Sequence, residues 1–237
     1  MKKYIGTKQI EAEPMTMGEA YERGLLQVGR VPDAEYAKRM GYHVKYADGY
    51  ESWLPAEPFE EAYKLADTSL DRMQIEAEEV NGRYVKLAAF IDSGKMDEVV
   101  NDMYNKCLLE MQCCTMFDYI RLLDTRIQRM QGSDGAKVRK MNFGMAIMAL
   151  KAGYPIRRSG WNGKGLMVFK QVPAHIESDI IPKMQSLPQP AKDLILKGKG
   201  FIDYTSQCLI YNENTGRADS WVPSISDVFA EDWEIVQ

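Results

Sequence analysis

Two long runs of apolar residues with heptad-like spacing constrain the fold of this chain most strongly. The first places an apolar residue every three or four positions from Leu70 to Ile91, and the second does so from Leu109 to Met130. This period is typical of one face of an α-helix and of the seam of a coiled coil. Ser93-Gly94 supplies a turn between the runs. The sequence therefore predicts two antiparallel helices that pack along their seams.

Shorter elements precede this helical hairpin. Gly41–Tyr46 and Tyr50–Leu54 alternate between apolar and polar residues on either side of an Asp48-Gly49 turn, which predicts a β-hairpin. We also expect a strand at Lys2–Glu11 and a helix at Pro55–Lys64. The N-terminal part of the chain is thus predicted to be a small module of strands and a helix.

The segment after the hairpin begins with a linker, Gln131–Gly135, which is short, polar and rich in glycine. Asn142 is a plausible N-cap for a helix that runs to Lys151. An excursion from Ala174 to Lys199 contains three prolines, which should divide it into short helices. The other predicted elements are strands at Pro155–Arg158, Leu166–Gln171, Gly200–Tyr204, Cys208–Tyr211, Arg217–Trp221 and Trp233–Val236, and a brief helix at Ser224–Ala230.

Together these elements predict an α+β protein. Residues 1–65 form a small module with a β-hairpin and a helix, and residues 66–131 form the helical hairpin. Residues 132–137 are the linker, and residues 138–237 form a helix with an antiparallel β-sheet.

Charge is distributed unevenly along the 237 residues, whose formal net charge is −4. Residues 1–136 hold 17 basic and 24 acidic residues, whereas residues 137–237 hold 13 basic and 10 acidic ones. The acidic front argues against binding to a nucleic-acid polymer, and the mildly basic remainder suits a small anionic ligand, although ordinary surface charge explains the asymmetry equally well.

Composition also excludes several classes of site. No apolar run reaches about 18 residues, so no membrane span is expected. Charged residues soon interrupt the N-terminal segment, which therefore lacks the continuous apolar stretch of a secretory signal. We therefore expect a cytoplasmic protein. The four cysteines form no C-x-x-C pair and only two histidines are present, so we expect free thiols, no metal site and no cofactor.

Aromatic, basic and small polar residues gather in the C-terminal module. Tryptophan rings can stack on a base, cationic groups can contact phosphates, and hydroxyl or carboxylate groups can bond to sugar hydroxyls. The candidates for stacking on a base are Trp161 and Trp221, and those for contacting phosphates are Arg158 and Lys164. Ser224 and Asp227 are the candidates for bonding to sugar hydroxyls, and Asn162 lies in the same turn as Trp161.

Each of these candidates has a structural alternative. Trp161 can be a lid that packs on the module, and Trp221 can belong to the core. Ser224 and Asp227 stand where a helix would be capped. Arg158 follows Arg157 on a predicted strand, so only one of the two can reach a given pocket.

Catalytic residues are not indicated. His175 lacks a nucleophile motif beside it, and the spacing of Asp203, Asp219 and Glu231 does not indicate that they form a carboxylate cluster. We therefore expect binding without turnover.

Four sequence motifs carry a resemblance to a known family. They are Asn142-Phe143-Gly144, Arg158-Ser159-Gly160-Trp161-Asn162-Gly163-Lys164, Trp221-Val222-Pro223-Ser224 with Asp227, and Ala230-Glu231-Asp232-Trp233. Their order and spacing make Met141–Val236 resemble the Thoeris anti-defence type-two family of bacteriophage proteins, which act as signal sponges. The helical hairpin resembles segments of crAss-like phage proteins.

The resemblance implies a function. It implies sequestration of cyclic ADP-ribose isomers made by TIR enzymes and, in some members, of cyclic oligonucleotides from CBASS immunity. It also implies a homotetramer in the cytoplasm of the infected bacterium. The alternatives are a phage structural or interaction protein that acts through its helical hairpin, and a nucleotide-signal hydrolase.

One internal similarity in the sequence has two possible origins. Ser52-Trp53-Leu54-Pro55 resembles Ser220-Trp221-Val222-Pro223, and both follow a predicted strand and precede a predicted helix. Trp53 therefore belongs either to a duplicated module or to a convergent turn.

Overall fold

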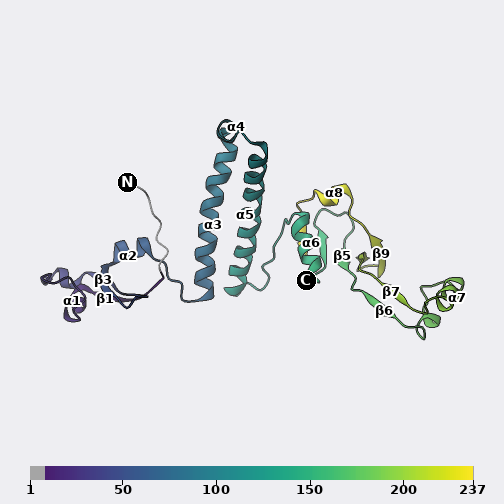
Figure 1. Cartoon of the computed structure of the whole chain (residues 1–237), viewed down its shortest axis with the longest axis horizontal. Coiled ribbons are helices and arrows are strands. Elements are labelled where there is room, and N and C mark those ends of the chain that lie inside the picture. The colour runs from purple at the N-terminus through teal and green to yellow at the C-terminus, as the bar shows by residue number, and fades with distance from the viewer. Residues whose placement is uncertain (1–8, 237) are drawn as a thin grey trace. The chain divides into compact units, whose positions relative to one another are not determined.

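The computed structural model describes residues 9–236 and confirms the α+β class (Figure 1). The chain divides into two units, Met1–Glu76 and Ala77–Gln237, and each is described by itself. The four-part division predicted from the sequence stays a prediction. Within the described residues, no helix combines the length and apolarity needed to span a bilayer.

The first unit contains a three-stranded antiparallel sheet in the order β1-β2-β3. The strands are β1 (Ile10–Thr16), β2 (Met40–Tyr46) and β3 (Glu51–Pro55), and the predicted β2–β3 hairpin is confirmed. The strand predicted at Lys2–Glu11 lies mostly outside the described residues. The helical elements are α1 (Met17–Glu22), the 3-10 turn η1 (Tyr36–Lys38) and α2 (Ala56–Ala62).

Trp53 organises the small core of this unit. Its side chain is buried with Met15, Met17 and Ala20, and its indole N–H donates to the carbonyl of Met15 at 2.9 Å. Gly41 lies against it so closely that a Cβ there would approach the Trp53 ring to 2.5 Å. Trp53 is thus a core residue joining two strands.

The helical hairpin consists of α3 (Ser69–Asp92), α4 (Lys95–Val99) and α5 (Met103–Met130). From Ala77 onward α3 lies beside α5, where the rings of Tyr84 and Phe117 are 5.6 Å apart. Lys106 of α5 forms an ion pair with Asp97 of α4. Gly94 takes the left-handed conformation (φ 73°) at the predicted turn. The short helix α4 after it was not predicted.

The C-terminal module is built on a five-stranded sheet in the order β10-β4-β5-β8-β9. Helix α6 (Phe143–Lys151) packs against it, with Asn142 as the N-cap as predicted: its side chain accepts from the Met145 amide. The strands are β4 (Ile156–Arg158), β5 (Leu166–Lys170), β8 (Cys208–Asn212), β9 (Arg217–Trp221) and β10 (Trp233–Ile235), and α8 (Ile225–Val228) precedes β10.

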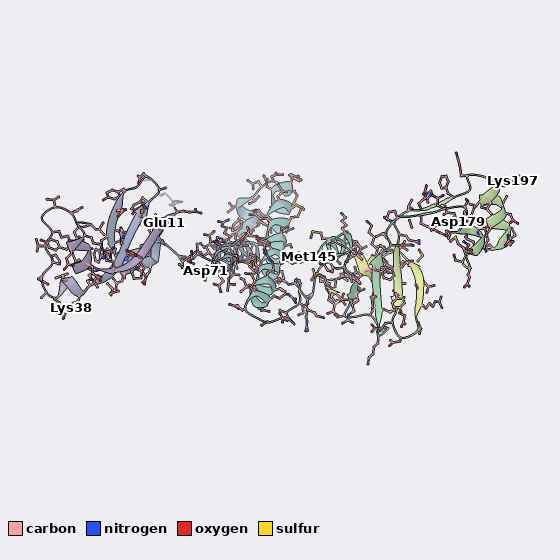
Figure 2. The ribbon with its side chains drawn as sticks, turned by 90° about the horizontal axis from the view of Figure 1, so that it is seen from below. Glu11, Lys38, Asp71, Met145, Asp179 and Lys197 are labelled. Atoms are coloured by element: carbon pink, nitrogen blue, oxygen red, sulfur yellow. The ribbon has the colours of Figure 1, made fainter. Side chains whose placement is uncertain are left out.

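The predicted excursion forms an arm beyond this sheet. A two-stranded ribbon, β6 (Ala174–Ile176) and β7 (Ile202–Tyr204), carries the 3-10 turn η2 (Ile181–Lys183) and α7 (Gln189–Lys197). Figure 2 shows Asp179 and Lys197 at the far end of this arm. Strand β6 was not predicted, because the sequence pattern there gave only proline-broken helices.

Candidate functional site

Arg158 ends strand β4 and makes two ion pairs with the closing segment of the chain. Its Nε donates to Oδ1 of Asp232 at 2.7 Å, and its Nη1 donates to Oδ1 of Asp227 at 3.0 Å. The preceding Arg157 instead donates to Glu234 at 2.6 Å. Arg157 and Arg158 therefore have different partners, as the alternation of a strand requires.

Asp232 also fixes the turn that follows β4. Its carboxylate accepts from the Gly160 amide at 2.8 Å, and its carbonyl accepts from the Ser159 amide at 3.0 Å. A Cβ on Gly160 would lie 2.6 Å from the same carboxylate. A larger residue at this position would force the carboxylate away from the Gly160 amide.

Asp227 is the buried centre of the network. Its Oδ1 accepts from Arg158 and, at 3.2 Å, from the Trp161 indole N–H. Its Oδ2 accepts from the Ser224 hydroxyl at 2.7 Å and from the Ser224 amide at 3.0 Å, which closes a capping box at the start of α8. Burial raises the pKa of Asp227, but these hydrogen bonds outweigh burial and hold the pKa below its ordinary value. Asp227 is therefore ionised at neutral pH.

Trp233 forms the aromatic floor beneath this network. It is fully buried, and the rings of Trp161 and Trp221 meet it edge-on at 5.4 Å and 6.2 Å. Its indole N–H donates to the carbonyl of Asp227 at 3.1 Å. Both predicted stacking residues therefore already pack, in part, on a third tryptophan.

The structure thus brings four of the seven predicted residues into one network and places the others around it. Trp221 contacts the floor. Asn162 and Lys164 are exposed on the turn, and within residues 9–236 neither side chain has a hydrogen-bonding or ion-pair partner. The network residues are Arg158, Trp161, Ser224 and Asp227.

Charge in the site follows from these pairings. Two carboxylates neutralise Arg158, and their hydrogen bonds raise its pKa further above the ordinary value. Lys164 therefore offers the accessible positive charge of the turn, and its own carbonyl is held by the Asn214 amide at 2.7 Å. A phosphate could contact Lys164 directly, whereas Nε and Nη1 of Arg158 are already bonded to carboxylates.

Sequence reasoning did not assign a role to Asp232, although the closing Ala-Glu-Asp-Trp motif contained it. Trp233, in the same motif, was not among the candidate residues either, and its ring is fully buried. The charge of Arg158 was a signal that a carboxylate partner should be sought, but 74 positions separate Arg158 from Asp232. Only the pairing of β4 with β10 brings the two together.

Among the residues weighed for catalysis, His175 and Asp203 pair with each other, and Asp219 pairs with Arg217. His175 lies on the ribbon with its Nδ1 2.6 Å from Oδ1 of Asp203, and Asp219 accepts from Arg217 at 2.7 Å. Among residues 9–236, no group of three or more histidine, cysteine or acidic side chains could hold a metal ion. All four cysteines are free.

Comparison with known proteins places these features in a family. The model of the Thoeris anti-defense 2-like domain matches residues 141–236, and the model of a family described as Sequestin matches residues 67–129. The protein Thoeris anti-defense 2 of Bacillus phage SP01 is 34% identical over 102 residues, which cover 41% of this chain and 96% of that protein. Through its C-terminal module, the chain belongs to the Thoeris anti-defense 2-like family.

Proposed function

We propose that this protein is a phage anti-defence protein that binds a nucleotide immune signal and sequesters it without degrading it. The observation that carries the proposal is the turn from Ser159 to Gly165, which presents Trp161 and Lys164 above a rigid network within a Thoeris anti-defense 2-like domain. The ligands that this site suits are cyclic ADP-ribose isomers, with CBASS cyclic oligonucleotides as a second class. The description Sequestin, attached to the family that matches the hairpin, also favours sequestration.

The chemistry of the site supports capture in three ways. The partly exposed Trp161 ring can stack on a base, the Lys164 ammonium can pair with a phosphate, and the Asn162 amide can bond to a sugar or phosphate oxygen. The network of Arg158, Asp227 and Asp232 holds the turn in place before the ligand arrives, which reduces the entropy lost on binding. We further propose that the protein acts as a homotetramer in the host cytoplasm.

Calorimetric titration with a purified cyclic ADP-ribose isomer tests the proposal. Trp161→Ala and Lys164→Ala should each weaken binding by roughly 5- to 150-fold, the equivalent of about 1–3 kcal/mol. Lys151→Ala removes an exposed lysine at the end of α6 and should leave the affinity unchanged. Wild-type affinity in both site variants would contradict the proposed site.

Mass spectrometry of the bound ligand separates the alternatives. A sponge releases the intact signal when the protein is heated, whereas a hydrolase releases fragments. No detectable binding of any cyclic nucleotide would favour an interaction protein that acts through its hairpin.

A further inference from the structure

Helix α5 carries an uncharged stripe along one side of the helical hairpin. Most of its residues follow one another at helical spacings of three or four, which lie on one face of a helix, and Gln112, next to Met111, lies at the edge of that face. Helix α5 contains seven charged residues, and none of them falls on this face between its first and last members. We call the stripe the α5 face; it comprises Tyr104, Leu108, Met111, Gln112, Thr115, Tyr119 and Leu122.

The α5 face is partly buried at one end and exposed at the other. Leu122 packs against the core of the C-terminal module, so this side of the helix is already a packing surface there. Toward the N-terminal end of α5, Tyr104, Leu108 and Met111 are 70%, 42% and 60% exposed. The apolar surface therefore extends beyond what the C-terminal module covers.

A groove lies beside the exposed part of this face. It has a volume of about 330 Å³, with Val80 and Met116 among the apolar residues that line it. Arg83, Gln112 and Thr115 line it as well, and Arg83 is paired with Glu79 in the same helix. The groove thus offers a mainly apolar hole with a neutralised rim.

We infer that this side of the hairpin is an interface between two copies of the chain. The projecting Leu108 and Met111 and the groove lie on the same side, so one copy can insert its apolar side chains into the groove of the other and receive the same contact in return. A twofold axis makes such a reciprocal contact automatically. Because the α5 face is uncharged, it suits an equally uncharged surface and disfavours a nucleic acid or a highly charged peptide.

The size of the surface predicts how tight the contact is. From Tyr104 to Tyr119 the helix rises about 22 Å, and two helices side by side are roughly 20 Å wide. Two copies would therefore bury about 900 Å² in total, which is the size of a weak, transient interface. The dimer should dissociate at micromolar concentration. In the dimer, four helices would cover the seams that two helices leave half-exposed.

Sedimentation velocity of the full chain tests the inference across about 1–100 μM, where an interface of this size should dissociate. Met111→Glu or Leu108→Glu should remove one association step and leave any contact made by the C-terminal module. Met103→Glu is the matched control, because Met103 is more exposed (77%) on the same helix but lies off the α5 face. Circular dichroism should show that all three variants keep their helix content.

Photo-crosslinking identifies the occupant directly. A benzophenone amino acid at position 108, in a mixture of isotopically light and heavy protein, should join light peptides to heavy ones from α3 or α5. Two results would overturn the inference: crosslinks confined to single chains, or glutamate variants that sediment like wild type at every concentration. Neither outcome depends on the proposed ligand.

Discussion

At the scale of single residues, Asp227 joins several functions in one carboxylate. It caps α8, pairs with Arg158 and holds the indole of Trp161. The sequence indicated either a cap or a sugar-binding group, and the structure shows the cap. A ribose contact would have to come from the same buried carboxylate, which already accepts several hydrogen bonds.

Asp227→Asn should therefore destabilise the ligand-free protein. The amide keeps the shape but loses the charge and one acceptor, at a cost of roughly 2 kcal/mol for charge-assisted bonds. For a module of about 100 residues this corresponds to a melting temperature lower by roughly 10 °C, measured by calorimetry. An unchanged melting temperature would show that the network contributes little to folding. Asp219→Asn, at an exposed pair with Arg217, is the control.

Acid should release the same network. In Asp232, as in Asp227, burial raises the pKa, but the bonds from Arg158 and Gly160 lower it further, to below the ordinary value. A carboxyl whose folded pKa is depressed stabilises the fold above its unfolded pKa and loses that contribution as pH falls through the folded pKa. Stability should thus be level near neutrality and fall below about pH 4, and urea titrations of Asp232→Asn should show a weaker fall than wild type.

At the scale of elements, local patterns predicted the regular structure well. Alternating residues identified β2 and β3, the strands predicted in the C-terminal module include β8 and β9, and the heptad-like seams identified α3 and α5. Strand β6 was missed because the prolines of its segment indicated only short helices, and its strand partner among the described residues is β7 across the arm.

The candidate site was less accessible to prediction. Turn and cap residues such as Trp161 and Ser224 can be recognised in the sequence from their residue types and their neighbours. The way they combine depends on Asp232 and Trp233 from the last strand, and a sequence pattern does not show which distant carboxylate an arginine will meet. The exposure of Lys164 likewise follows from the folded turn.

The ribbon of the arm should respond to pH in the opposite direction to the carboxylate network. Asp203 raises the pKa of His175 by hydrogen bonding, with Glu177 nearby. A raised histidine pKa stabilises the folded ribbon below the unfolded value of about 6.5, and this contribution is lost as pH rises through the folded pKa. NMR titration should place the pKa of His175 above 6.5, and Asp203→Asn should lower it. An equal pKa in both proteins would show that the pair is not formed in solution.

At the scale of the whole molecule, the C-terminal module has a core of its own but also packs against the hairpin. Its centre is formed by Trp233 with Met141, Ile156 and Val168. Leu122 of α5 packs on this core, and the Asn142 side chain donates to Asp118 of α5. The N-cap of α6 is thereby fixed from outside the module.

A fragment from Lys137 to Gln237 should therefore fold but be less stable than the same module in the full chain. It loses a half-buried leucine contact worth about 1 kcal/mol and a hydrogen bond worth about 1 kcal/mol. Its melting temperature should be lower by roughly 10 °C, while its ligand affinity stays close to that of the full chain, because the turn and its network lie within the fragment. Calorimetry and titration of the fragment measure both quantities. Leu122→Ala and Asp118→Asn in the full chain should together reproduce the loss of stability. If the fragment is folded but does not bind the ligand that the full chain binds, the hairpin or the first unit must contribute to the site.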